Sequence, residues 1–428
     1  MSTGQPRTLS EWLIHQQSVH PRDIALGLER VASVAGRLGL KRPARHVITV
    51  GGTNGKGSTV AFIEAMARAA GHSVGAYTSP HLLRYNERVR INGNDASDTA
   101  LVATFERIEA AREQTPLTYF EYGTLAALML FEQADLDLAV LEVGLGGRLD
   151  AVNLIDADVA VVTTVALDHM EYLGNDREAI ALEKAGIFRN GRVAVIGELS
   201  PPPSLLREAE RLGARVVRAG QDYKFGDKLG GRWFWQDATL KLDLSRPRLV
   251  APAQIANAAA AIAALRALPA SLVVGAEPIG VGVAVAQVPA RLQRIPGPIE
   301  ILVDVAHNPQ AAQQLAQWMM RNRAAGATQA VFAALADKDA PHMIGAMLSV
   351  VDQWRLAGSS GFGARGQTVE ALWRQVDTLM SRTLCTRHET VEDALAAARS
   401  SAHEGDRILV FGSFHTAAAA LKELLPSS

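Results

Sequence analysis

The stretch HVITVGGTNGKGST, residues 46–59, decides the predicted fold. It opens with an apolar, β-branched run, residues 46–50, which is typical of a buried parallel strand. A glycine-rich turn occupies residues 51–58, and residues 59–70 space their apolar side chains as a helix does. A strand, a glycine loop and a helix together are the context of a phosphate-binding loop, because glycine backbone N–H groups and a helix N-terminus attract phosphate.

Two side chains strengthen the interpretation of residues 51–58 as a phosphate loop. Lys56 adds a positive charge, and Ser58 offers a hydroxyl to the magnesium that accompanies ATP. The match to the usual phosphate-loop pattern is not literal, because Val50 replaces the first glycine and Gly57 separates Lys56 from Ser58. The alternative is an ordinary glycine-rich strand-to-helix turn, but a lysine set among so many glycines favours phosphate binding.

The bulk properties of the chain limit its class. Its 428 residues predict two domains. A net charge of −1 gives no bulk electrostatic reason to expect nucleic acid or an anionic membrane as partner. The single cysteine, Cys385, excludes a disulfide framework within the chain and fits a cytoplasmic protein. The N-terminus has no signal-peptide core, and the apolar runs are too short to span a bilayer.

Strands alternate with helices along most of the sequence, which predicts an α/β fold. We expect a P-loop domain with a doubly wound, mostly parallel sheet over residues 1–285, with N-terminal helices (one over residues 22–38) and a small β-hairpin region near 222–245. A smaller, Rossmann-like α/β domain is expected over residues 286–428. The glycine-containing residues 280–289 are the expected linker.

Polar residues follow the predicted strands in both domains. In open parallel sheets ligands bind beyond the carboxyl ends of the strands. These residues therefore predict a ligand-binding cleft between the domains. They include Ser79, Glu142, Asp168, His169, Asp304, His307, Ser413 and His415.

Five residues have both a functional and a structural interpretation. Glu142 is a magnesium ligand or a strand-end acid that reaches solvent. His169 contacts a metal or phosphate, or is a capping histidine. Lys184 reaches solvent from an apolar helix, or is a buried lysine modified to carry negative charge. Asn257 makes a helix-face hydrogen bond in its structural interpretation, and Arg291 is a surface residue or an arginine that reaches ATP phosphates.

Nine motifs in a fixed order add a family resemblance. They are GGTNGKGS, TSPHL, NERVRING, FEYGT, LEVGLGGRLDAVN, LDHMEYLG, EKAGIF, AHNP and GSFHT. Over residues 20–420 the chain resembles folylpolyglutamate synthases, most strongly the bacterial bifunctional dihydrofolate synthase/folylpolyglutamate synthases, and more distantly the Mur ligases. The resemblance implies an ATP-dependent ligase that makes an acyl phosphate on dihydropteroate or a reduced folate. The amine of L-glutamate then attacks the acyl phosphate.

The resemblance also implies a role for each matching position. ATP would be bound by Gly52, Thr53, Asn54, Gly55, Lys56, Gly57, Ser58, Thr59, Asn257, Arg291, Asp304 and His307. Two magnesium ions would be bound by Ser79, Glu142 and His169. The pterin and glutamate substrates would be bound by Phe120, Asn153, His307, Ser413 and His415. The catalytic residues would be Lys56, His169, Lys184 and Arg291, with Lys184 carbamylated. A monovalent cation and a monomeric enzyme are further expectations.

One position departs from the family pattern, and two other functions compete. Val305 replaces the glycine of D-G-A-H-N-P, which predicts strain if that position needs a positive φ or a close approach of the nucleotide. A catalytically silent nucleotide-binding module would have lost Lys56, Glu142 or His169, and all three are present. A Mur-type ligase acting on a UDP-sugar peptide is disfavoured by Gly57 and by the lack of an additional N-terminal UDP-binding domain.

Overall fold

The computed structural model describes residues 7–20, 24–363, 365–381 and 383–425. The chain forms two compact units. Unit 1 comprises Met1–Arg248 and Ile255–Gln287, and unit 2 comprises Leu249–Gln254 and Val288–Ser428. The functional division between residues 285 and 286 stays a prediction.

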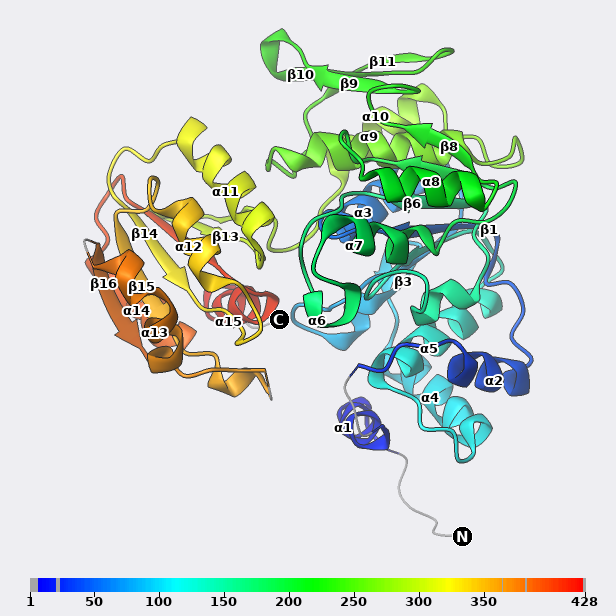
Figure 1. Ribbon diagram of the computed structural model, residues 1–428, viewed down its shortest axis with the longest axis horizontal. Helices are drawn as coiled ribbons and strands as arrows, with labels where there is room; N and C mark the ends of the chain where they lie inside the picture. The colour runs from blue at the N-terminus through cyan, green and yellow to red at the C-terminus, as the bar shows by residue number, and fades with distance from the viewer. Residues whose placement is uncertain (1–6, 21–23, 364, 382, 426–428) are drawn as a thin grey trace. The chain divides into compact units, whose positions relative to one another are not determined.

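Unit 1 is built on an eight-stranded sheet in the order β4-β3-β2-β5-β1-β6-β7-β8 (Figure 1). The strands are β1 (Ala44–Gly51), β2 (Val74–Tyr77), β3 (Val89–Ile91), β4 (Asn94–Asp95), β5 (Leu136–Glu142), β6 (Val159–Val162), β7 (Val193–Ile196) and β8 (Arg215–Arg218). All pairs from β2 to β8 in this order are parallel, and the two pairs at the other edge, β2–β3 and β3–β4, are antiparallel. This confirms the predicted α/β class with a mostly parallel sheet.

The central strands explain why the sheet forms there. Val47, Ile48 and Val50 of β1 are completely buried. β1 pairs with β5 on one side and β6 on the other, and a strand covered on both faces favours such a continuous β-branched run. Because β2, β5, β1 and β6 are parallel neighbours, the residues that follow them meet at one edge of the sheet.

Helices of unit 1 pack on its sheet and on one another. They are α1 (Leu9–Val19), α2 (Glu29–Leu38), α3 (Lys56–Ala69), α4 (Asp98–Arg112), α5 (Tyr119–Gln133), α6 (Met170–Leu173), α7 (Arg177–Ala185), α8 (Pro203–Arg211), α9 (Ala253–Arg266) and α10 (Ala276–Val285). The described part of the predicted helix over residues 22–38 begins only at Glu29, and residues 22 and 23 of that prediction lie outside the described residues.

The expected linker over residues 280–289 is wrong for its first half. Residues 280–285 belong to α10, which packs on α3. A Cβ at Gly282 would lie 2.4 Å from the Cα of Met66, so a glycine is needed for this close helix contact. Glycines that serve packing look the same in the sequence as glycines that serve flexibility.

A three-stranded antiparallel sheet, in the order β11-β10-β9, accompanies unit 1. Its strands are β9 (Lys224–Asp227), β10 (Arg232–Gln236) and β11 (Lys241–Ser245). Trp233 and Trp235 are buried, and the indole N–H of Trp235 donates to the carbonyl of Ala259 in α9 at 3.1 Å. Trp235 thereby attaches the small sheet to the α9 helix.

Unit 2 contains a six-stranded sheet in the order β12-β13-β17-β14-β15-β16 (Figure 1). Its strands are β12 (Gln293–Ile295), β13 (Glu300–Val303), β14 (Thr328–Phe332), β15 (Gln353–Ala357), β16 (Leu384–His388) and β17 (Arg407–Phe411). Only β12 is antiparallel. The helices are α11 (Pro309–Arg321), α12 (Ala340–Met347), α13 (Val369–Met380), α14 (Val391–Ser401) and α15 (Phe414–Leu424).

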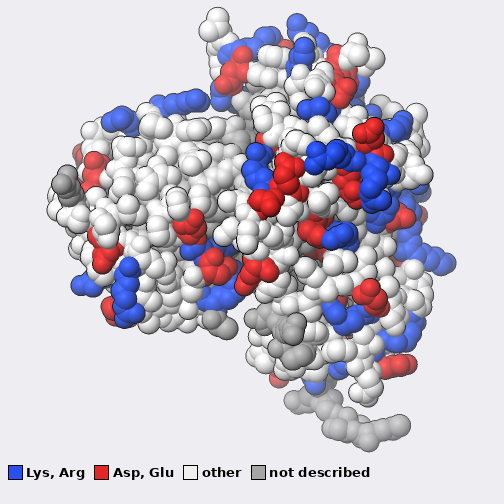
Figure 2. Space-filling view, in the orientation of Figure 1, with Lys and Arg blue, Asp and Glu red and all other residues white. Residues whose placement is uncertain are grey.

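The surface carries charges of both signs. On the face drawn in Figure 2, Lys and Arg side chains alternate with Asp and Glu side chains over unit 1, in keeping with a net charge of −1. Within the described ranges of the chain, no helix has the length and apolar character needed to cross a membrane.

Candidate functional site

The phosphate loop connects β1 to α3 and is seated on the residues that follow β6. The N–H of Thr53 donates to the carbonyl of Thr164 at 2.8 Å, and the N–H of Asn54 donates to the Thr164 hydroxyl at 2.9 Å. The Thr163 hydroxyl donates to the carbonyl of Asn54 at 2.7 Å. Gly52 has a φ of +144°, and a Cβ there would lie 1.9 Å from Oγ1 of Thr163. The loop conformation therefore requires glycine at residue 52.

Lys56 and Ser58 lie at the start of α3. The Lys56 ammonium folds over the loop and donates to the carbonyls of Gly52 at 3.0 Å and Thr53 at 3.2 Å. The hydroxyls of Ser58 and Thr59 are buried and have no hydrogen-bond partner among the described residues. A buried hydroxyl without a partner is costly, so these two atoms fit a site that a ligand completes.

Glu142 and Ser79 meet beside this loop. Glu142 ends β5 opposite Val50, and its carboxylate accepts the N–H of Ser79 at 3.1 Å. A Cβ at Gly57 would lie 3.4 Å from the same carboxylate oxygen. Glu142 is buried at 4% exposure, so it does not simply reach solvent. The carboxylate and nearby serine hydroxyls are the hard oxygen ligands that magnesium prefers.

Asn257 reaches the phosphate loop from α9. A Cβ at Gly55 would lie 2.3 Å from Oδ1 of Asn257, so the amide lies directly against the loop. Gly55 also has a φ of +88°, which favours glycine. Asn257 thus lies against the residue that precedes another helix, α3.

His169 precedes α6 and has a φ of +50°. Its N–H donates to the Asp168 carboxylate at 2.9 Å, and its ring Nε2 lies 3.9 Å from the same carboxylate. Across the described chain, no group of three or more His, Cys, Asp or Glu side chains is spaced to hold a metal ion. The structure therefore does not join His169 and Glu142 into such a cluster, and a magnesium ion here would depend on hydroxyl, water and phosphate oxygens as well.

Lys184 is buried near the end of α7, with 3% of its surface exposed. Burial and then the nearby charge of Lys56 lower the pKa of Lys184 to about 7, although Asp168 and Asp150 act in the opposite direction. The lysine is held there by the loop after β5. A Cβ at Gly147 would lie 2.7 Å from the carbonyl of Glu183, and the N–H of Arg148 donates to that carbonyl at 2.8 Å.

Three of the expected nucleotide residues lie together in unit 2. Asp304 follows β13 and accepts the N–H groups of Leu292 and Ala306, both at 2.7 Å. Burial raises the pKa of Asp304, while the charge of Arg291 opposes this rise. The rings of His307 and Phe414 are 5.6 Å apart, and the Arg291 guanidinium lies 5.2 Å from the centre of the Phe414 ring.

Ser413 and His415 follow β17, the strand next to β13. The Ser413 hydroxyl caps α15 by accepting the N–H of Thr416 at 3.0 Å, so this hydroxyl has a structural role. The His415 ring is exposed and stacks on Phe362 with 5.2 Å between ring centres. The two side chains therefore have different surroundings despite being two residues apart.

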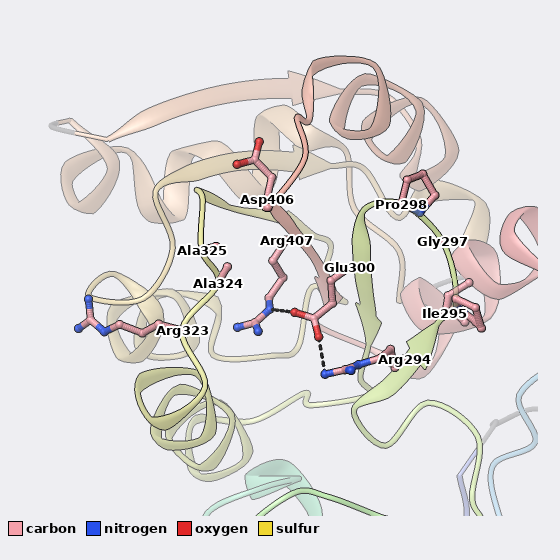
Figure 3. A pocket seen from close by; sticks show the side chains of 12 residues that line it. Arg294, Ile295, Gly297, Pro298, Glu300, Arg323, Ala324, Ala325, Asp406 and Arg407 are labelled. Carbon is pink, nitrogen blue, oxygen red and sulfur yellow. Dashed lines mark hydrogen bonds and ion pairs between the residues drawn. The ribbon is translucent and has the colours of Figure 1, made fainter.

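A separate pocket of about 360 Å³ lies at the amino ends of β13 and β17. Figure 3 shows Arg294 and Arg407 both directed at Glu300. The Glu300 carboxylate is 2.6 Å from Arg294 and 2.5 Å from Arg407, so it neutralises much of the positive charge. This pocket is at the opposite strand ends from Asp304 and Ser413 and is not the candidate site.

Comparisons with known proteins identify the family. Residues 50–265 match the Mur ligase middle domain, and residues 290–414 match the Mur ligase glutamate ligase domain. The dihydrofolate synthase/folylpolyglutamate synthase of Escherichia coli K12 is 45% identical over 96% of this chain and 94% of that protein. The corresponding Haemophilus influenzae protein is 40% identical over 96% of each chain. This chain belongs to the dihydrofolate synthase/folylpolyglutamate synthase family.

Solved structures agree with the sequence comparison. E. coli FolC in complex with DHPP and ADP has a TM-score of 0.92 and 44% identity, covering 98% of this chain and 99% of that chain. The Yersinia pestis bifunctional enzyme complexed with AMPPNP and Mn ion has a TM-score of 0.90 and 42% identity, covering 99% and 100%. Dihydrofolate synthase/folylpolyglutamate synthases are ATP-dependent ligases of the Mur ligase family, so this chain is a ligase with their two-part α/β fold.

The structure of this family member answers one of the two conditions set for strain at Val305. Val305 is not among the described residues with a positive φ. Its N–H donates to the carbonyl of Ala290 at 3.0 Å, an ordinary hydrogen bond that any non-proline residue can make. Strain from a positive φ therefore does not arise at Val305, and the condition of a close nucleotide approach stays untested.

The two residues expected near the pterin differ in how their side chains are used. Phe120 lies near the start of α5, and its ring packs so closely on Gly144 that a Cβ there would be 2.6 Å away. The Asn153 amide donates to the carbonyls of Arg148 at 2.9 Å and Gly186 at 3.0 Å, and it accepts from Arg189 at 2.9 Å. Asn153 therefore holds loops together in this ligase.

Sequence reasoning missed Asp150 as a residue of the site. Its buried carboxylate accepts the N–H of Leu145 at 2.8 Å and of Val152 at 3.1 Å. Burial raises the pKa of Asp150 to about 7, and these backbone hydrogen bonds and the charge of Lys56 act in the opposite direction. An aspartate after LEVGLGGRL looks like a solvent-exposed loop acid, because only the fold brings it near Lys56.

Proposed function

We propose that this chain adds L-glutamate to 7,8-dihydropteroate, giving dihydrofolate, and to reduced folates, giving folylpolyglutamates. The family membership supports this assignment over the whole chain. The single observation that carries the chemistry is the position of the buried Glu142 carboxylate beside Gly57 and Ser79. The Glu142 carboxylate would there serve as a hard anionic ligand next to a loop that suits phosphate.

The loop residues from Gly52 to Thr59 would bind the ATP phosphates. Backbone N–H groups, the start of α3 and Lys56 would provide positive potential for them. Lys56 now donates to loop carbonyls, and a phosphate would offer the ammonium a stronger, charged acceptor. Asn257 would contact the nucleotide from its position against Gly55.

Glu142, Ser79, Ser58 and His169 would hold the divalent metal. The unpartnered buried hydroxyl of Ser58 supports this assignment, since a metal–phosphate ligand would complete its surroundings. When bound, magnesium would neutralise charge on the ATP phosphates. The Yersinia pestis relative was solved with AMPPNP and Mn ion. A monovalent cation stays a prediction.

Lys184 would carry a carbamate. A neutral amine is needed to attack carbon dioxide, and burial lowers the pKa of Lys184 to about 7. Attack would form an N–C bond, break one C–O π bond of carbon dioxide and release one proton from the nitrogen, which turns the neutral amine into an anionic carbamate. The anion would then balance the charge of Lys56, and it would assist Glu142 and His169 at the metal.

The reaction itself requires no protein nucleophile. A carboxylate oxygen of the pteroate or folate would attack the γ-phosphorus of ATP, and the bond from that phosphorus to ADP would break. The amine nitrogen of L-glutamate would then attack the carbonyl carbon of the acyl phosphate. Its C–O bond to phosphate would break, and the nitrogen would lose a proton to solvent. Protein groups contribute positioning and charge stabilisation.

Residues of both units would supply the remaining contacts. Arg291 would approach the transferred phosphate, with Asp304 and His307 near the nucleotide. His307, Ser413 and His415 would receive glutamate, and Phe120 and Asn153 would form part of the pterin pocket. A monomeric state is part of the same proposal.

Replacing Glu142 tests whether its carboxylate is needed for the reaction. In Glu142→Gln we expect phosphate release, in the presence of ATP, magnesium, L-glutamate and dihydropteroate, to fall about 100-fold or more, because the anionic ligand is lost. Glu210→Gln changes an exposed acid of α8 and is the matched control, expected to keep the wild-type rate. A wild-type rate in Glu142→Gln would remove Glu142 from the proposed metal site.

A further inference from the structure

Arg291 lies between two residues with an unusual backbone. Ala290 has a φ of +53° and Leu292 has a φ of +48°. Residues with side chains rarely adopt this left-handed region, and a bulky residue such as leucine does so least readily. Such a conformation persists only where surrounding contacts determine it, and it is often found at functional sites. The contacts around Arg291 are therefore informative.

Several hydrogen bonds hold this segment, among them one from Nη1 of Arg291 to the carbonyl of Ala290 at 3.4 Å. Oε1 of Gln293 accepts the N–H of Ala290 at 2.8 Å. The Asp304 carboxylate accepts the N–H of Leu292 at 2.7 Å, and the carbonyl of Ala290 accepts the N–H of Val305 at 3.0 Å. Asp304 was expected to touch nucleotide, but Gln293 matched no expected role. Gln293 begins β12 and pairs with Val303, so its own backbone is fixed by the sheet.

Phe414 holds the other end of the arginine. The Arg291 guanidinium lies 5.2 Å from the centre of the Phe414 ring, within the range of a cation–π interaction. The same ring is 5.6 Å from the His307 ring. Phe414 begins α15, whose capping residue Ser413 follows the central strand β17. A rigid aromatic ring thus contacts two residues that we assign to the nucleotide.

We propose that Gln293 and Phe414 are positioning residues for Arg291, with Gln293 fixing its backbone and Phe414 its guanidinium. This inference rests on the proposed role of Arg291 at the transferred phosphate. A long arginine side chain has many rotamers, and holding it near one of them before the reaction lowers the barrier for a step that depends on its charge. Without the Gln293 oxygen, the Ala290 N–H loses its acceptor and the left-handed backbone can relax.

The experiment is a pair of double-mutant cycles in the full-length enzyme. Phosphate release with ATP, magnesium, L-glutamate and dihydropteroate is measured for Gln293→Met, Phe414→Leu and Arg291→Ala. The two positioning substitutions are also measured in the Arg291→Ala background. We expect each to lower kcat at least fivefold in the wild-type background, to leave the KM for dihydropteroate within twofold, and to change kcat less than twofold when Arg291 is absent.

Two controls separate positioning from folding. Trp373→Leu removes another cation–π pair of unit 2, in which Arg387 lies 5.2 Å from the ring centre, and should leave kcat unchanged. Phe414→Tyr keeps an aromatic ring against Arg291 and should restore most of the activity that Phe414→Leu loses. Thermal unfolding and the active fraction are measured for every variant, and kcat is calculated per folded enzyme. If Gln293→Met fails to fold, the Phe414 cycle decides the proposal.

The outcomes distinguish this inference from the proposed function. Equal losses with and without Arg291 would indicate a general structural role and overturn the positioning of Arg291. Wild-type kcat in both Gln293→Met and Phe414→Leu, with an impaired Arg291→Ala, would overturn the positioning while leaving the role of Arg291 in place. Full activity in Arg291→Ala would overturn both that role and the positioning that depends on it.

Discussion

At the residue scale, Ser58 shows how one atom can separate a binding residue from a structural one. Its hydroxyl is buried without a hydrogen-bond partner among the described residues, whereas the Ser73 hydroxyl both donates to and accepts from Asp137, each at 2.9 Å. The two serines are similar in the sequence and differ in what the fold provides for them. Their substitution should therefore have opposite consequences.

We expect Ser58→Ala to affect the metal and not the fold. No hydrogen bond within the described protein is lost, and alanine is the better helix residue, so the free energy of unfolding should stay the same or rise by about 0.5 kcal/mol. The magnesium concentration for half-maximal activity should rise about tenfold. Ser73→Ala should instead lower the unfolding free energy by about 1 kcal/mol. An unchanged magnesium requirement in Ser58→Ala would exclude its hydroxyl from the metal site.

Lys184 gives a pH-dependent prediction. Its pKa is about 7 in the folded chain against 10.5 as the ordinary value, so the unfolded chain binds more protons between these two pH values. Its contribution therefore makes stability rise with pH in this interval, by up to about 1.4 kcal/mol per pH unit for one proton. Lys184→Met should flatten that rise and be more stable than wild type at pH 7 in the absence of ligands.

Urea unfolding of both proteins at pH 7 and pH 9 measures this difference. Parallel stability changes in wild type and Lys184→Met would show that Lys184 does not titrate in this interval. Carbon-13 bicarbonate offers an independent readout, since an NMR carbamate signal is expected in wild type and should be missing from Lys184→Met. The same substitution should remove ligase activity although it stabilises the fold.

At the element scale, the connection from β1 to α3 could be predicted because its pattern is local. The buried strand, the glycines and Lys56 are adjacent in the chain, and their backbone requirements can be inferred from residue type. The edge strands β12 and β16 were not predicted. β12 has only three residues, and β16 is mostly exposed, so neither has the apolar run that indicates a buried strand. Contacts between residues far apart in the sequence could not be predicted either, such as the hydrogen bond from Arg189 to the Asn153 side chain.

Glycine substitutions test which glycines the elements require. Gly52→Ala places a Cβ 1.9 Å from Oγ1 of Thr163 at a φ of +144°, so we expect a loss of about 2 kcal/mol in unfolding free energy and weaker nucleotide binding. Gly36 lies inside α2 with no atom within 4 Å of the added Cβ. Gly36→Ala should therefore stabilise the chain by about 0.5–1 kcal/mol.

Thermal unfolding and titration with a fluorescent ATP analogue measure both glycine variants. If a folded Gly52→Ala protein bound the ATP analogue with wild-type affinity, the phosphate loop would not require glycine at residue 52. A destabilised Gly36→Ala protein would indicate a contact of α2 that the structure does not contain.

At the scale of the whole molecule, each unit has its own mostly parallel sheet, with candidate residues beyond the strand ends. Unit 1 contains the phosphate loop, Glu142 and Lys184, and unit 2 contains Arg291, Asp304 and His307. Neither set alone includes both the phosphate loop and the proposed glutamate residues. Family membership, which rests on similarity over nearly the whole chain, identifies the reaction class. The range of acceptor substrates depends on details of the binding pocket that the sequence motifs do not specify.

The most direct measurement is therefore of glutamate addition to each of the two acceptor substrates. Purified protein is incubated with ATP, magnesium and L-glutamate, with 7,8-dihydropteroate in one sample and tetrahydrofolate in another. Phosphate release is measured, and the mass of each product is determined by mass spectrometry. We expect one equivalent of phosphate for each glutamate added, with glutamate added in both samples. ATP binding without glutamate addition in either sample would contradict the proposed ligase function.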